Sequence, residues 1–298
     1  MDGKRVIGVD LGGTKILAGI VDRDGRIERR RENPTPVTSE DDLLAGLDAA
    51  VQELLDDDIA AIGFGIPSPI DQRTGRAEQA VNIPLDAGVP FRDRMAEKFG
   101  LPVGIENDAN AATYAEFHFG AGREARTIVM LTLGTGCGGG AVIDGALYRG
   151  WAEFGHIVIV YDGIPCQGTC TGRGHLEPYV TGVAATKLAQ EEFGPAVDSH
   201  RLVRLASEGD QRAIAILDGI GRHLGAGIGS LVNIFSPELV VIGGGFAAAG
   251  DFILDPAREI VAREGLAGVG KRVRIVRAEL GTAAGLIGAA LVAFDAVQ

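Results

Sequence analysis

Short apolar runs alternate along the chain with glycine-rich turns and with longer stretches of helical spacing. Near the N-terminus, "VIGV" and "ILAGIV" flank "DLGGTK", and "DRDG" at 22–25 then indicates a hairpin turn. The same order returns over 127–148, where "TIVMLTL" and "AVIDGALY" flank "GTGCGGG". We interpret this as an internal repeat of two β-hairpins, each with a glycine-rich tip and each opening one half of the chain.

The spacing of apolar positions predicts helices and strands around these hairpins. Helical spacing over 39–55, with Ser39 as N-cap and acidic residues behind it, predicts a helix. Residues 103–120 predict a strand that runs into a helix capped by Asp108 or Asn110. Alternating strands and helices, with a hairpin at the start of each half, predict mixed sheets. The other predicted elements are a strand at 59–67, helices within 183–235, a strand, glycine turn and helix over 237–250, a strand at 272–280 and a helix at 283–294.

Composition and charge narrow the class of protein. The chain of 298 residues is 46% hydrophobic and 23% charged, which is typical of a soluble globular protein. Its net charge of −12 argues against nucleic acid as the main partner. Asp10 interrupts the first apolar run too early for a signal peptide, and no window reaches about 18 uncharged apolar residues, so we expect no membrane span. Three cysteines are too few for a disulfide framework, which predicts a cytoplasmic, reducing compartment.

Glycine is the compositional outlier, and its clusters predict a phosphate site. The 45 glycines, about twice the usual share, fall in loops where backbone N–H groups could approach phosphate oxygens. "GTGCGG" fits a dinucleotide fingerprint, but a strand follows it instead of a helix, and "GVDLGGTK" has Thr and Lys in the wrong order for a Walker A loop. What remains is the layout of two hairpins that grip one nucleotide, as in actin-like phosphotransferases. The predicted nucleotide-binding residues are Asp10, Gly12, Gly13, Thr14, Lys15, Gly134, Thr135, Gly136, Gly244 and Gly245.

Several of these residues have simpler interpretations when they are taken singly. Asp10 could only form the turn, and Thr14 and Thr135 could be ordinary strand ends. Lys15 could contact phosphate or merely flank the loop. The nucleotide prediction therefore depends on the two hairpins together.

The segment "CQGTCTGRGH" at 166–175 places two cysteines four positions apart and ends on a histidine, with His156 ten residues before Cys166. His156, Cys166, Cys170 and His175 would make a closed Cys₂His₂ set for a structural zinc ion. The alternatives are free buried thiols and a disulfide, of which the compartment disfavours the second. Cys137 lies inside the second glycine-rich loop, and we interpret it as a small loop residue.

Six motifs in order, "VDLGGTKI", "ENDANAA", "LGTGCGGG", "EFGH", the cysteine cluster with "GHLE", and "VVIGGG", resemble the ROK family of sugar kinases and sugar-sensing repressors over 4–294. The resemblance implies an α/β chain with the actin-like ATPase (ribonuclease H-like) fold, two α/β domains with mixed sheets around a central cleft. We place the smaller domain at 1–109 plus 281–298, and the larger at 110–280 with a zinc-type loop at 156–177. The repressors carry a helix-turn-helix domain first, for which the position of Asp10 leaves no room.

The resemblance implies ATP-dependent phosphorylation of the 6-hydroxyl of a hexose, with glucose as the first expectation. ROK kinases carry their catalytic base at the position that matches Asp108, with the sugar-binding asparagine at Asn107. A carboxylate at the turn before a helix can accept a hydroxyl proton, although its simpler role is an N-cap. The further positions that match the family's sugar site are Ser68, Asn82, Glu153, His156 and Glu177.

The family also implies Mg²⁺ with the ATP, with Asp10 as an outer ligand, and a homodimer or homotetramer. Its zinc pattern is a histidine followed by C-x-C-G-x-x-G-C-x-E. Here the first cysteine stands two residues upstream and His175 replaces the last cysteine, and both changes keep a possible ligand.

Several alternatives to a glucokinase stay open on the sequence. Within the kinases they are a fructokinase, an N-acetylmannosamine or other N-acetylhexosamine kinase, and a polyphosphate-using glucokinase. Outside them are a sugar-sensing regulator without its DNA-binding arm and an actin-like filament or chaperone ATPase. The last class would lack the sugar residues and the Cys/His cluster.

Overall fold

The computed structural model describes residues 5–78, 80 and 83–297, so Asn82 of the predicted sugar site lies outside the described residues. The chain forms two compact units. The first comprises Met1–Gly120, Arg149–Trp151 and Thr282–Gln298, and the second comprises Ala121–Tyr148 and Ala152–Gly281. The domain boundary predicted after residue 109 differs from this division. Helix α3 stays whole in the first unit because it packs along α9, the last helix of the chain.

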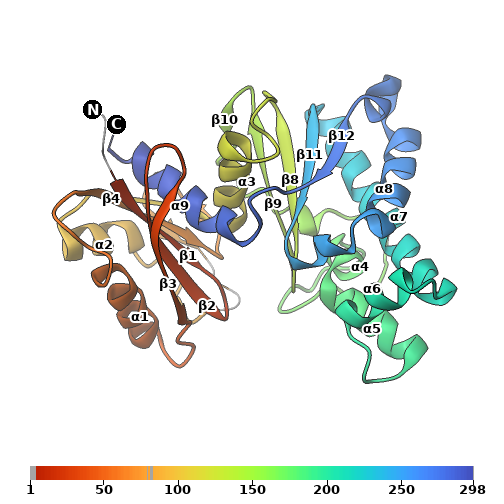
Figure 1. The fold of residues 1–298 in the computed structure, drawn as a ribbon, viewed down its shortest axis with the longest axis horizontal. Coiled ribbons are helices and arrows are strands. Elements are labelled where there is room, and N and C mark those ends of the chain that lie inside the picture. The colour runs from red at the N-terminus through yellow and green to blue at the C-terminus, as the bar shows by residue number, and fades with distance from the viewer. Residues whose placement is uncertain (1–4, 79, 81–82, 298) are drawn as a thin grey trace. The chain divides into compact units, whose positions relative to one another are not determined.

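The first unit is built on a five-stranded mixed sheet with the order β3-β2-β1-β4-β7 (Figure 1). The three strands from β3 to β1 are antiparallel, whereas β4 and β7 run parallel to β1. Its strands are β1 (Arg5–Leu11), β2 (Lys15–Val21), β3 (Ile27–Pro34), β4 (Ile59–Ile66) and β7 (Val103–Asn107), and a separate two-stranded ribbon joins β5 (Ile70–Asp71) to β6 (Arg76–Ala77).

Helices cover both faces of this sheet. Alternate residues of β1, such as Ile7 and Val9, share one core with the apolar residues of α1 and α2. The opposite face receives α9, which Figure 1 shows in blue beside the red strands of the N-terminus. Gly63 of β4 permits this approach, since a Cβ atom there would overlap the carbonyl oxygen of Ala289. The helices are α1 (Glu40–Gln52), α2 (Phe91–Phe99), α3 (Asp108–Phe119) and α9 (Ala284–Asp295).

The second unit repeats this sheet topology, which confirms the predicted internal repeat and extends it beyond the hairpins. Its strand order is β10-β9-β8-β11-β12, with the first three strands antiparallel and the last two parallel to β8. Each strand therefore has a counterpart at the same place in the first sheet. The strands are β8 (Ile128–Leu133), β9 (Cys137–Ile143), β10 (Ala146–Leu147), β11 (Leu239–Gly243) and β12 (Arg274–Arg277).

The predicted helices of the second unit are present, with changes at their ends. A 3₁₀ turn, η2 (Gly245–Ala249), separates the glycine turn after β11 from the helix expected there. The strand predicted at 272–280 is shorter, and Cys137 is the first residue of β9, where it is buried. The helices are α4 (Glu177–Val180), α5 (Gly182–Phe193), α6 (Ser199–Ser207), α7 (Gln211–Phe235) and α8 (Asp251–Glu264), with further 3₁₀ turns η1 (Phe154–His156), η3 (Leu266–Lys271) and η4 (Gly281–Ala283).

Among the described residues, no helix combines the length and the apolar character that crossing a membrane requires. The longest helix, α7, is amphipathic in its burial and packs against α8 within the second unit.

Candidate functional site

Two carboxylates of the first unit lie at one edge of its sheet. Asp10 is near the end of β1, and Asp108 follows directly after β7. Both strands run parallel to β4, so their carboxyl ends lie at the same edge, which is where open α/β sheets bind ligands. Burial raises the pKa of Asp10 to about 7, and repulsion from Asp108 contributes to the rise. This edge therefore concentrates negative charge that a cation or a proton would relieve.

Asn107, and not Asp108 or Asn110, caps helix α3, which corrects the prediction from the sequence. The Oδ1 atom of Asn107 accepts hydrogen bonds from the backbone N–H groups of Ala109 at 2.9 Å and Asn110 at 3.1 Å. Asp108 is the first helical residue, and its Oδ1 atom accepts a 2.8 Å hydrogen bond from the N–H of Ala109. Because the cap is supplied by its neighbour, the Asp108 carboxylate stays available for a ligand.

The surroundings of Asp108 favour its protonated form. Burial raises the pKa of this carboxyl, while hydrogen bonds from the backbone lower it in part. The side chain is nevertheless only partly buried by accessible surface, so a small molecule can reach it. A carboxylate of raised pKa with an open approach has the properties of a general base.

The first glycine-rich turn brings the predicted residues Asp10 to Lys15 together. The N–H of Gly12 donates to the carbonyl of Lys15 at 2.9 Å, and the hydroxyl of Thr35 donates to the carbonyl of Gly12 at 2.7 Å. Gly13 and Thr14 form the tip between the two strands. The ammonium of Lys15 pairs with Glu32 at 3.0 Å, and both side chains are about half exposed. Within this unit Lys15 therefore flanks the loop and contacts its own sheet.

Ser68 contributes its backbone to this region, but its hydroxyl is occupied. The residue is 2% exposed, and its Oγ donates to the carbonyl of Pro69 at 3.1 Å. The carbonyl oxygen of Ser68 accepts a 3.4 Å bond from Nδ2 of Asn107. Ser68 thus supports Asn107.

The second unit holds a matching turn between β8 and β9. The N–H of Gly134 donates to the carbonyl of Gly136, and the carbonyl of Gly134 accepts from the N–H of Gly182 at 3.0 Å. Glu177, the first residue of α4, accepts a 2.8 Å bond from the N–H of Cys137. A Cβ atom on Gly136 would lie 2.8 Å from Oε2 of Glu177, so the turn and this carboxylate fit closely only because residue 136 is glycine.

A cavity of about 950 Å³ opens beside this turn within the second unit. Three predicted nucleotide-binding residues, Gly134, Thr135 and Gly245, line it, whereas Gly136 and Gly244 do not. Its volume suits a nucleoside-sized ligand. Helices α5 and α6 add polar residues to the wall that were not predicted from the sequence, namely Thr186, Lys187, Gln190, Ser199, His200 and Arg204.

The remaining predicted sugar-binding residues of the second unit lie on two segments that are joined by a backbone hydrogen bond. Glu153 precedes the 3₁₀ turn η1 and His156 is its last residue, with Oε2 of Glu153 3.7 Å from Nδ1 of His156. The carbonyl of Ile157 accepts a 2.9 Å bond from the N–H of Leu176, the residue before Glu177. This bond ties the segment with His156 to the segment with His175 and Glu177, so Glu153, His156 and Glu177 share one support.

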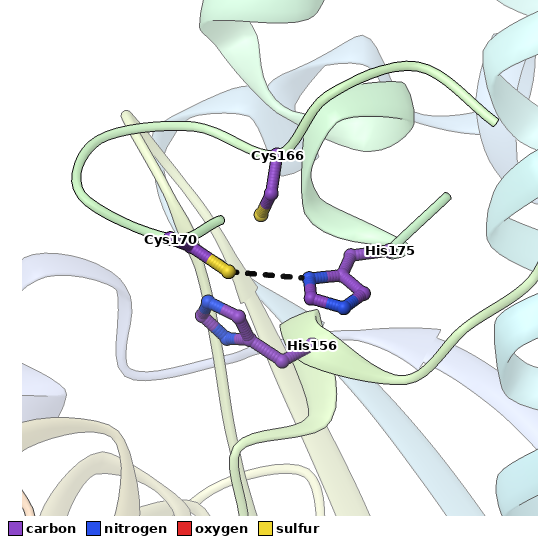
Figure 2. A group of neighbouring side chains, drawn as sticks. All are labelled: His156, Cys166, Cys170 and His175. Atoms are coloured by element: carbon purple, nitrogen blue, oxygen red, sulfur yellow. Dashed lines mark hydrogen bonds between the residues drawn. The ribbon is translucent and has the colours of Figure 1, made fainter. Parts of the chain in front are cut away.

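The Cys/His cluster comes together as a set of four ligands. One potential ligand atom from each of His156, Cys166, Cys170 and His175 lies within 4.8 Å of all the others. Figure 2 shows the four side chains converging, with Sγ of Cys170 3.6 Å from Nδ1 of His175. Bonds of about 2.0–2.3 Å to a tetrahedral zinc ion place its ligand atoms about 3.3–3.8 Å apart, so small side-chain adjustments would suffice. Nδ1 of His156 is buried without a hydrogen-bond partner, which also fits a ligand role.

The ROK family model matches residues 6–296. The chain belongs to the ROK family. A glucokinase from Streptomyces coelicolor is 36% identical over 95% of this chain and 96% of its own length. A ROK family glucokinase from Streptomyces griseus, solved in complex with glucose and AMPPNP, is 34% identical with a TM-score of 0.85, covering 98% of this chain and 99% of that one. A ROK hexokinase from Thermus thermophilus is 36% identical with a TM-score of 0.82 over 98% and 99%.

This likeness, with the two mixed sheets, confirms the predicted fold class, the actin-like fold of ROK sugar kinases. The residues that sequence reasoning missed in this ROK chain share one property: they lie on helices with ordinary helical spacing. Lys187 and Arg204, for example, carry no glycine or motif signal in the sequence. Only the packing of α5 and α6 around the turn of β8 and β9 brings them to the cavity.

Proposed function

We propose that this ROK protein is an ATP-dependent glucokinase-type hexose kinase, which transfers the γ-phosphoryl group of ATP to the 6-hydroxyl of glucose. The similarity to glucokinases over nearly the whole chain supports the reaction class. The single structural observation that carries the proposal is the carboxylate of Asp108, which the helix cap does not use. It stands at the head of α3, with a raised pKa and with the helix cap supplied by Asn107.

In this reaction Asp108 would accept the proton of the 6-hydroxyl as its oxygen attacks the γ-phosphorus. The new O–P bond forms while the bond to the β-phosphate oxygen breaks, which yields glucose 6-phosphate and ADP. The raised pKa of Asp108 strengthens it as a proton acceptor relative to an ordinary carboxylate. The amide of Asn107 would hold the sugar beside it.

We assign the nucleotide to the turn and cavity of the second unit. The backbone N–H of Thr135 at the turn would face phosphate oxygens, and the cavity walls would hold the nucleoside. In the first unit, the neighbouring carboxylates of Asp10 and Asp108 suit a hydrated Mg²⁺ ion, with Asp10 as an outer ligand of the ion. Mg²⁺ bound with ATP would spread the charge of the phosphates.

For the sugar, we propose Glu153, His156 and Glu177 as further hydrogen-bonding partners. Vicinal hydroxyls suit carboxylates and imidazole, which accept and donate in fixed directions. Ser68 would act through Asn107, because its own hydroxyl is bound to Pro69.

We also propose that His156, Cys166, Cys170 and His175 hold a structural zinc ion. Four protein ligands leave no open position, so the ion would fix the loop and take no part in the reaction. Its effect would reach the sugar residues through the backbone bond between Ile157 and Leu176.

The test is a panel of glucose, mannose, fructose, N-acetylglucosamine and N-acetylmannosamine, with ATP and with polyphosphate as donors. We expect the highest kcat/KM for glucose with ATP. Asp108→Asn should lower kcat by about 10³-fold or more while glucose binding stays measurable by calorimetry.

Asp93→Asn is the matched control, because Asp93 is an exposed aspartate in the first turn of α2. It should leave kcat unchanged. Near-normal turnover of Asp108→Asn would refute the role of Asp108, and absence of transfer to every hexose would refute the function itself.

A further inference from the structure

Glu106, the residue before the helix cap, is a buried carboxylate to which the proposed reaction assigns no role. It lies in β7 and is 2% exposed. Its Oε1 atom accepts hydrogen bonds from the backbone N–H of Asn107 at 2.9 Å and from Nδ2 of Asn110 at 3.1 Å. Both partners are neighbours of Asp108 in the first turn of α3.

The second oxygen of Glu106 is also fully used. Oε2 accepts a 2.9 Å bond from Nε2 of Gln72 and lies 3.5 Å from Nε of Arg149. Arg149 in turn donates to Asp295 at 3.0 Å, so this guanidinium is fixed between two carboxylates of the first unit. Burial raises the pKa of Glu106, and its hydrogen bonds and Arg149 oppose that rise. A carboxylate with both oxygens occupied and almost no exposure cannot contact the sugar.

These bonds complete the start of α3 in an unusual way. In a capping box, the side chain at the third helical position reaches back to the N–H of the N-cap residue. Here the N-cap is Asn107, and the side chain of Asn110 instead donates to Glu106, which itself accepts from the N–H of Asn107. Glu106 thus links both ends of the first turn by hydrogen bonds to Asn107 and Asn110, and Asp108 lies between these two residues.

We propose that Glu106 is a positioning residue for the phosphoryl transfer, which holds the first turn of α3 so that Asn107 and Asp108 keep their geometry toward the sugar. This inference rests on the proposed function. Its basis is the placement of both Oε1 bonds on either side of Asp108 and the exclusion of Glu106 from solvent. A displacement of about 1 Å at a reacting group can cost about 100-fold in rate.

Three substitutions of Glu106 distinguish the effect of its hydrogen bonds at Oε1 from the effect of its negative charge. Glu106→Ala removes every contact and should lower kcat by about 100-fold, with KM for ATP unchanged within about threefold. Glu106→Gln keeps a carbonyl oxygen for Asn107 and Asn110 and loses the charge facing Arg149, so it should restore kcat to within about fivefold of wild type. Glu106→Asp keeps the charge but is one methylene shorter, and should resemble the alanine variant.

Glu116→Gln is the matched control, because Glu116 is a fully buried glutamate of α3, about two turns beyond Asp108. It should leave kcat within about threefold of wild type, even where it lowers the melting temperature. Backbone amide exchange at 107–110 gives a readout that needs no activity, and it should rise in the alanine and aspartate variants only.

The outcomes separate this inference from the proposed function. An active wild type with an equally active Glu106→Ala variant would overturn the positioning role and leave the kinase assignment standing. A wild type that phosphorylates no hexose would overturn both. Where Glu106→Ala fails to fold, the aspartate and glutamine variants decide: equal kcat values in these two would refute the proposal, and a slow aspartate beside a fast glutamine would support it.

Discussion

Replacing Asp10 by Asn is expected to stabilise the ligand-free protein while it damages the kinase reaction. Asp10 lies at the carboxyl end of β1, where burial and repulsion from Asp108 raise its pKa from 3.8 to about 7. Its ionised form is therefore unfavourable in the folded state when no cation is present. Asn has nearly the same shape and removes the charge.

The magnitude follows from the difference between the folded and unfolded pKa. Because the folded pKa is the higher one, the folded protein binds more protons than the unfolded chain between pH 3.8 and about 7. The contribution of Asp10 to the free energy of unfolding thus falls as the pH rises through this window, and its full cost applies above about pH 7. Each pH unit corresponds to about 1.4 kcal/mol, so Asp10→Asn should stabilise the protein by about 1.5 kcal/mol at pH 5 and about 4 kcal/mol at pH 8.

Urea unfolding at these two pH values measures the effect. Trp151, the single tryptophan, belongs to the first unit, so its fluorescence reports on the unit that contains Asp10. Asp57→Asn is the control, because Asp57 is an exposed acid of the same unit. A stabilisation that is absent at pH 8, or equal at both pH values, would show that the ionised form of Asp10 does not destabilise the folded protein. The same variant should bind ATP with Mg²⁺ more weakly, because the residue proposed to face the ion is lost.

Two further predictions concern the second unit. Cys170→Ser should lower the zinc content from about one ion per chain and remove about 4 kcal/mol of stabilisation at free zinc about 1,000-fold above its Kd; elemental analysis and thermal unfolding measure both, and zinc-free protein with wild-type stability would refute the metal site. Gly136→Ala should raise KM for glucose by about tenfold, because the new Cβ atom displaces Glu177 from its bond with the N–H of Cys137. Gly219→Ala is its control, since a Cβ atom at Gly219 meets nothing within 4 Å, and an unchanged KM in Gly136→Ala would show that Glu177 does not depend on this fit.

The fold was predictable from the sequence because the repeat is local. Each hairpin consists of consecutive residues, which form a strand, a glycine-rich tip, a second strand and an Asp-Gly turn. In the second hairpin that turn has positive φ at Asp144 and Gly145, the geometry that Asp-Gly favours between antiparallel strands. The parallel strands β4, β7, β11 and β12 could be recognised as apolar runs, but their order in the sheets depends on contacts between residues far apart in the chain.

The details of the site depended on choices that local patterns leave open. The segment "ENDAN" contains three residues that can each cap a helix by their chemistry alone, namely Asn107, Asp108 and Asn110. The backbone direction at the end of β7 decides in favour of Asn107. The occupied hydroxyl of Ser68 and the pairing of Lys15 with Glu32 likewise depend on neighbours that no local pattern identifies.

The order of residues in "ENDAN" explains how one helix start can serve both stability and chemistry. A helix start needs acceptors for its free N–H groups, and a catalytic base needs a carboxylate that those groups do not consume. Asn107 meets the first need, and Glu106 accepts from the N–H of Asn107 itself. Asp108 therefore does not supply the cap, and burial raises the pKa of its carboxyl. A carboxylate one position earlier would be consumed by the cap and would gain two N–H bonds that lower its pKa, which would make it a better cap and a poorer base.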